Sequence, residues 1–239
     1  MKQIGLVVCL ASALGGCFYQ PDTPAPAAQL EDAAADQVQG PAAAKPTKTS
    51  PPTAMVEEDV HCDVEAKCLT KLPGIASRSG KNLNLRLENG SKKSFPSTDR
   101  CEIAGESCVL TSLVDYRPSQ HLFVLSAQYY ESTASIIVSR RTGEVFRIED
   151  AAPHFSPDGK HFVVVAVSEQ DGINQVAIYS TSAFPPVLEW SHMPKSWSTT
   201  FEFIGWNGND RVKLRTFDQK SDAEISRTST GWRLTPADG

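Results

Sequence analysis

The chain has 239 residues, a formal net charge of −5, and 40% hydrophobic against 21% charged residues. This composition is that of a globular protein and excludes a wholly disordered chain. Its basic residues are scattered, and nucleic-acid binding draws its affinity from clustered cations that neutralise phosphates. The composition therefore argues against a nucleic-acid partner.

Residues 1–16 are typical of an export signal. Lys2 is followed by an apolar stretch, residues 4–14, that is shorter than the ~20 residues a membrane-spanning helix needs. An ordinary secretory signal or a short core helix are the alternatives. Leu14-Gly15-Gly16-Cys17 resembles the lipobox of bacterial lipoproteins. The resemblance implies cleavage before Cys17 and attachment of a diacylglycerol and a further acyl chain such as palmitate to that residue.

The residue after the predicted lipidation site is Phe18. The absence of aspartate there resembles the sorting pattern of outer-membrane lipoproteins in Gram-negative bacteria. We therefore expect a lipid anchor in the outer membrane, on the periplasmic side. Residues 17–59 are predicted to be the lipidated cysteine and a linker. The part from 20 to 55 is rich in Ala and Pro and lacks aromatic residues, so we expect it to be disordered.

The folded domain is expected at residues 60–239 and retains four cysteines: Cys62, Cys68, Cys101 and Cys108. In an exported protein these favour disulfides. Cys62–Cys68 and Cys101–Cys108 are the preferred pairs because each closes a short loop, and the other two connectivities stay open. A zinc site that includes His61 is a weaker interpretation, because neither pair has the spacing of a structural zinc site. We expect no metal and no cofactor.

The domain is predicted to be all-β. Leu83, Leu85 and Leu87 alternate with polar residues, and Asn89-Gly90 then favours a hairpin turn. The continuous apolar run 162–167 is typical of a strand buried on both faces. No amphipathic helix is expected after residue 60.

Similar turns recur along the domain, and each is expected just before the leading strand of a strand group. They are Arg117-Pro118-Ser119-Gln120, Ser156-Pro157-Asp158-Gly159 and Trp206-Asn207-Gly208-Asn209. The first two are about 40 residues apart, which is the length of a four-stranded propeller blade. The pattern predicts a small or incomplete β-propeller, with a β-sandwich as the alternative.

The segment His154-Phe155-Ser156-Pro157-Asp158-Gly159-Lys160 and the apolar run after it resemble the WD40-like repeat of the TolB-type β-propellers, which are periplasmic scaffold proteins. The resemblance covers a short segment. In that family the segment is structural, so the resemblance implies a propeller blade and no chemistry.

The sequence contains none of the common hydrolase motifs, so we do not expect an enzyme. His121 and His161 follow successive turns, and we expect them to stabilise strand starts. The segment predicted to bind a partner joins two strand groups and carries Trp190, Met193 and Trp197. Exposed aromatic residues on loops are enriched at binding sites. The alternative is that both tryptophans pack at the edge of the core.

Three classes of function remain. The first is a membrane-anchored, non-enzymatic module that binds an envelope protein or a peptidoglycan-associated partner in the periplasm. The second is an inhibitor or immunity lipoprotein against a periplasmic toxin or a lysozyme-like hydrolase. The third is an envelope hydrolase whose site is assembled from distant loops, for which the sequence supplies no nucleophile and base.

Overall fold

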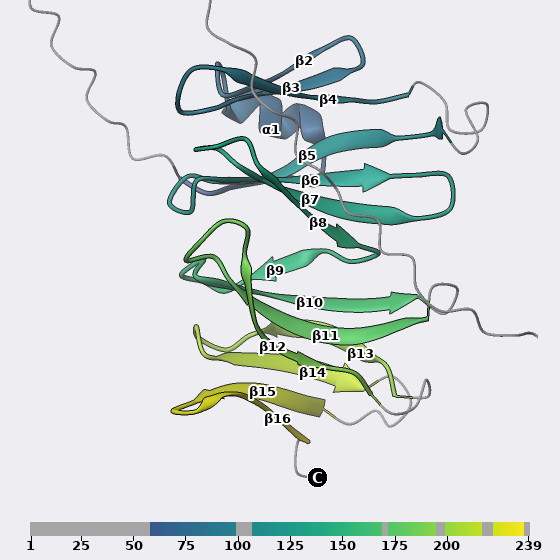
Figure 1. Ribbon diagram of the computed structural model, residues 1–239, viewed down its shortest axis with the longest axis vertical. Coiled ribbons are helices and arrows are strands. Elements are labelled where there is room, and N and C mark those ends of the chain that lie inside the picture. Colours follow the sequence, from purple (N-terminus) through teal and green to yellow (C-terminus); the bar gives the residue numbers. More distant parts are fainter. Residues whose placement is uncertain (1–57, 99–106, 169–171, 195–198, 217–221, 237–239) are drawn as a thin grey trace, which may run out of the picture. The chain divides into compact units, whose positions relative to one another are not determined.

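The computed structural model describes residues 58–98, 107–168, 172–194, 199–216 and 222–236. These residues form four antiparallel sheets that resemble propeller blades, together with one short helix. The sheets follow one another in the order of the sequence (Figure 1). The predicted all-β, propeller-like fold is confirmed. The predicted signal peptide, Cys17 and most of the predicted linker lie outside the described residues.

The first sheet contains β2 (Ala76–Ser79), β3 (Asn82–Arg86) and β4 (Lys92–Pro96). The second contains β1 (Val60–His61), β5 (Leu110–Arg117), β6 (Leu122–Gln128), β7 (Thr133–Ser139) and β8 (Val145–Glu149). The third contains β9 (Pro153–Phe155), β10 (His161–Ser168), β11 (Ile173–Ser180) and β12 (Val187–His192). The fourth contains β13 (Phe201–Trp206), β14 (Arg211–Thr216), β15 (Asp222–Thr228) and β16 (Gly231–Pro236).

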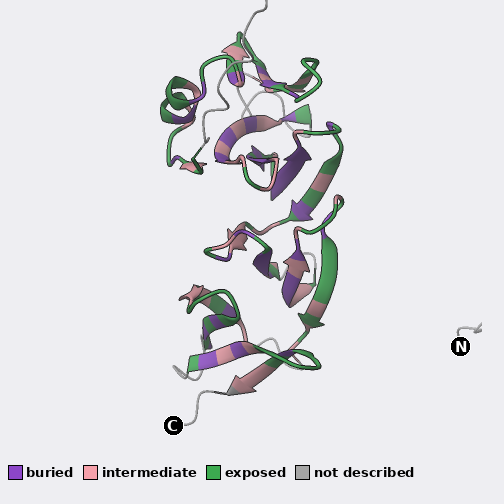
Figure 2. Cartoon of the chain, turned by 90° about the vertical axis from the view of Figure 1, so that its left-hand side faces the viewer, coloured by how far each residue is buried: buried purple, intermediate pink, exposed green. Residues whose placement is uncertain are grey.

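Three clusters of buried side chains each join two consecutive sheets. Strand β10 shows how one strand serves two of them. Phe162 and Val164 pack toward the second sheet, whereas Val163 packs toward the fourth. The continuous apolar run predicted from the sequence is therefore a strand buried on both faces up to Ala166, whereas Val167 is exposed. The alternation of buried and exposed residues can be followed along the strands in Figure 2.

The outer faces of the first and fourth sheets are polar. Leu83 and Leu85 of β3 are buried in the core, so Asn84 between them lies on the opposite face. In β14, Val212 and Leu214 are buried, and Lys213 between them is exposed. Within the described ranges, no buried cluster joins the first sheet to the fourth. The four sheets thus end in solvated faces, as the terminal units of repeat proteins do.

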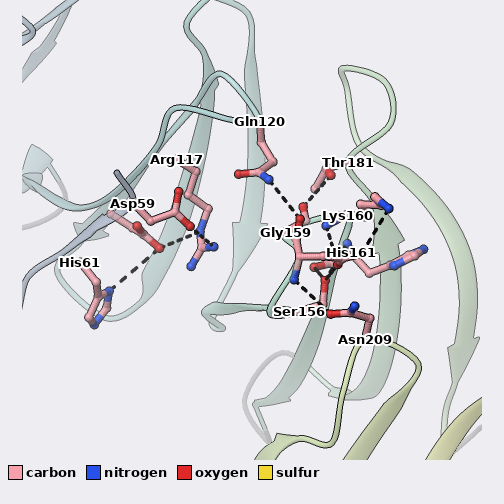
Figure 3. A network of polar contacts seen from close by, with 12 residues as sticks. Asp59, His61, Arg117, Gln120, Ser156, Gly159, Lys160, His161, Thr181 and Asn209 are labelled. Atoms are coloured by element: carbon pink, nitrogen blue, oxygen red, sulfur yellow. Dashed lines mark hydrogen bonds and ion pairs between the residues drawn. The ribbon is translucent and has the colours of Figure 1, made fainter. Parts of the chain in front are cut away.

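The recurring turns lie one strand later than the sequence suggests. They follow β5, β9 and β13, so the three turns join β5 to β6, β9 to β10 and β13 to β14. They are also hydrogen-bonded in series (Figure 3). Gln120 Nε2 donates to the Asp158 carbonyl at 3.3 Å, and the Asp158 amide donates to Asn209 Oδ1 at 3.1 Å. The turns therefore connect three consecutive sheets.

The central turn shows why its residues are Ser, Asp and Gly. Asp158 Oδ1 accepts hydrogen bonds from Ser156 Oγ at 2.8 Å and from the Lys160 amide at 3.1 Å. Gly159 has φ +67°, a left-handed conformation that side chains disfavour. A Cβ at Gly159 would also lie 2.2 Å from Gln120 Nε2. Glycine therefore permits both the turn and the contact from the neighbouring sheet.

The prediction of no helix after residue 60 is wrong, because α1 spans Glu65–Lys71. The helix has seven residues, and Val64 at its N-terminus provides no side-chain cap. A helix this short is marginal by itself, so its stability comes from tertiary contacts. Cys68 anchors it in the core. Cys68, Leu69 and Leu72 do recur at the spacing of one helix face, but a segment of seven residues is shorter than the roughly 11 or more over which this period is usually read.

The Cys62–Cys68 disulfide is present, with 5.6 Å between the Cα atoms. It joins the residue after β1 to the buried side of α1. Cys108 is also disulfide-bonded, whereas Cys101 lies outside the described residues.

Candidate binding surface

Among the strands that the structure describes, β12 is an edge of the third sheet and pairs with β11 alone. An edge strand presents unpaired backbone N–H and C=O groups to a partner. Val187 and Leu188 are each 50% exposed, and Met193, just after the strand, is 68% exposed. The strand thus combines an apolar surface with a backbone edge that pairs with no other described strand.

Strand β4, an edge of the first sheet, differs from β12 in the residue types that it carries. That strand carries Lys92, Lys93 and Pro96. Lysine and proline protect edge strands from unwanted pairing. The segment 187–193 contains neither residue type. Of these two edges, β12 is therefore the one suited to pair with another chain.

Trp190 lies within β12, because the strand extends to His192. A bulge opposite Ile178 and Tyr179 of β11 sets the register, and Trp190 pairs with Ile178. Its half-buried ring packs against the core between the third and fourth sheets and stacks on the His192 ring, with 6.1 Å between centroids. Trp190 therefore has a core contact as well as an exposed part, and its role in binding stays a prediction. Trp197 lies outside the described residues.

Glu189 fixes β12 against two neighbouring strands. Its Oε2 accepts a hydrogen bond from Trp232 Nε1 of β16 at 2.8 Å and lies 3.4 Å from His161 Nε2 of β10. Burial lowers the pKa of His161, and the Glu189 carboxylate opposes this effect. The neutral imidazole is therefore favoured near neutral pH. These contacts hold β12 in place against β10 and β16.

A second polar cluster joins the start of β1 to β5 (Figure 3). Arg117 donates from Nε to Asp115 Oδ2 at 3.0 Å and from Nη1 to Asp59 Oδ2 at 3.2 Å. Its guanidinium also lies 4.1 Å from the centre of the Phe155 ring. Burial raises the pKa of Asp115, and Arg117 opposes this effect. The cluster is a contact between two sheets, and Arg117 holds its two carboxylates in place.

The structure places the two turn histidines in different interfaces. His161 lies between the third and fourth sheets, beside Trp232. His121 precedes β6 and contacts Glu88 and Arg141. Nothing brings the two rings into one site.

Two negative findings concern only the described ranges. There, no group of three or more His, Cys, Asp or Glu side chains is arranged to hold a metal ion. No helix in the same part of the chain has the length and apolar character needed to cross a bilayer.

No family model and no curated protein matches the sequence. Among solved structures, the chain is similar to the β-propeller domain of Cps50 (Swd1) from Myceliophteria thermophila, with 11% identity, 66% of this chain covered, 57% of that chain covered and a TM-score of 0.38. A protein from Lactobacillus plantarum matches with 14% identity, coverage of 66% and 50%, and a TM-score of 0.33.

A putative 6-phosphogluconolactonase from Bacteroides uniformis matches with 10% identity, coverage of 68% of each chain and a TM-score of 0.33. The chain spans about half the length of the first two structures. All three structural similarities are distant.

Proposed function

We propose that the protein is a lipid-anchored, non-enzymatic binding module on the periplasmic face of the outer membrane. Its partner is an envelope protein or a protein associated with peptidoglycan, bound at the edge of β12. The observation that carries the proposal is the exposed apolar edge formed by Val187, Leu188 and Met193. The predicted export signal and the Leu14-Gly15-Gly16-Cys17 motif support the location.

An extended partner segment would bind β12 as an additional strand. Backbone hydrogen bonds would supply affinity, and alternate side chains of the segment would meet Leu188 and the exposed part of Trp190. The Glu189 contacts hold the strand before binding, so little entropy is lost on association.

Leu188→Lys is expected to reduce partner recovery from crosslinked envelopes at least about tenfold, because it places a charge on the apolar edge. The melting temperature should change little, since the side chain is half exposed. Val145→Lys is the matched control, because Val145 is 43% exposed on β8, the edge of the second sheet. Equal recovery with both variants contradicts the proposed site. If the recovered partner is a hydrolase and the protein inhibits it, the inhibitor class of function is favoured instead.

Cys17→Ala is expected to abolish both lipid attachment and membrane retention, because the cysteine thiol is the predicted acceptor. Cells are labelled with a palmitate analogue, and the membrane and soluble fractions are compared by immunoblot. Cys9→Ala is the control, since Cys9 lies within the predicted signal. A Cys17→Ala protein that keeps the label and stays with the membrane contradicts the anchor.

A further inference from the structure

The outer face of the first sheet contains a polar cavity of about 380 Å³, within the size range of small-ligand sites. Residues of β2, β3 and β4 and of the adjoining turns line it. They are Gly74, Ile75, Ala76, Ser77, Asn84, Arg86, Gly90 and Lys92. The set contains two cations and no carboxylate. The cavity is therefore locally positive, although the protein as a whole has a net charge of −5.

The two cations are direct cross-strand neighbours, because Arg86 of β3 pairs with Lys92 of β4. Like charges directly opposite each other destabilise a sheet. Among the described residues, neither side chain takes part in a hydrogen bond or an ion pair. Glu88 lies two residues after Arg86, but its carboxylate contacts His121 instead. The cavity therefore holds two uncompensated positive charges.

The remaining polar groups suit a hydroxylated ligand. Asn84 is held in place, because its Nδ2 donates to the Asn82 carbonyl at 3.3 Å and its Oδ1 accepts from Ser94 at 2.6 Å. Ser77 lies opposite Asn84 on β2 and is exposed. Both residues share the outer face with the cations, since Leu83 and Leu85 point into the core. A fixed amide and a free hydroxyl next to two cations can bind a charged group and a neighbouring sugar hydroxyl together.

We propose that this cavity binds a phosphate monoester carried by a sugar. The phosphate, with a charge near −2 at neutral pH, would lie between Arg86 and Lys92 and relieve their repulsion. Ser77 and Asn84 would contact hydroxyl groups of the sugar. The site lies in the first sheet, whereas the proposed partner surface lies in the third, so this inference does not rest on the proposed function.

The test is a calorimetric titration of the full chain at low salt. Glucose 6-phosphate, inorganic phosphate and glucose are titrated separately. Glucose 6-phosphate is expected to bind with a Kd below about 1 mM, more tightly than phosphate, and glucose is expected not to bind. Arg86→Gln and Lys92→Gln should each weaken binding at least about tenfold, because each removes one charge-assisted contact. Equal affinity for phosphate and glucose 6-phosphate overturns the sugar contact. No binding of either anion overturns the site.

Lys213→Gln is the matched control, since it makes the same charge change on the exposed face of β14. It should leave the affinity unchanged, and an equal loss in this variant would show that net charge alone attracts the anion. A second measurement separates binding from folding. Without ligand, Arg86→Gln should melt at or above the wild-type temperature, because the like-charge pair is gone. A lower melting temperature gives Arg86 a structural role and overturns the proposal.

Discussion

Trp232→Ala is expected to lower the free energy of unfolding by about 3–5 kcal/mol, the usual cost of removing a large buried aromatic side chain. Trp232 is 7% exposed and belongs to the core between the third and fourth sheets. Its ring packs edge-on against Trp206 and His161, with 6.2 Å and 5.3 Å between centroids. The substitution also removes the hydrogen bond to Glu189. Urea unfolding followed by circular dichroism measures the change.

The control for Trp232 is its neighbour Arg233, which is exposed on the same strand. Arg233→Ala should change the free energy of unfolding by less than about 0.5 kcal/mol, as exposed substitutions usually do. If both variants unfold at the wild-type urea concentration, Trp232 does not hold the last two sheets together.

Arg78→Met is expected to lower the free energy of unfolding by about 3 kcal/mol, because it leaves a partly buried carboxylate without its partner. Arg78 donates from Nε and Nη2 to the two oxygens of Glu65, both at 2.6 Å. The side chains are only 25% and 16% exposed, respectively. Arg78 Nη2 also donates to the Thr111 carbonyl at 2.5 Å, and Glu65 Oε1 accepts from the Leu113 amide at 3.0 Å. The pair thus joins α1, the first sheet and β5.

A double-mutant cycle separates the ion pair from the packing of the arginine stem. Glu65→Leu combined with Arg78→Met leaves no unpaired charge, so the double variant should be more stable than Arg78→Met alone. Chemical denaturation of the four proteins gives the coupling energy. Additive losses would show that the two side chains act independently, which contradicts the role of the pair.

The sequence was sufficient to predict the strands whose residues alternate or form continuous apolar runs. β3 is recognisable because Leu83 and Leu85 recur with a period of two, and the glycine turn at Gly90 ends the pattern. β10 is recognisable because both of its faces are buried. The repeat of the turns was also visible, since Pro, Asp, Asn and Gly have strong local conformational preferences.

Features that depend on contacts between distant residues were not predictable. The bonds from Gln120 and Asn209 to the central turn join residues 38 and 51 positions apart. Helix α1 depends on the Cys62–Cys68 bridge and on the ion pair of Glu65 with Arg78. The end of β12 shows the same limit: the strand continues past Trp190 to His192 because Ser191 and His192 pair with β11.

The polar outer faces of the first and fourth sheets have a consequence for folding. Among the described residues, every buried cluster joins sheets that are neighbours in the sequence, so each sheet packs only against sheets formed by adjoining parts of the chain. Unfolding should then start at the terminal sheets, each of which is held by one interface instead of two. Amide hydrogens of β6, β7, β10 and β11 should exchange most slowly with solvent, and those of β14 and β15 sooner. The chain would thus lose its order one sheet at a time, from its ends.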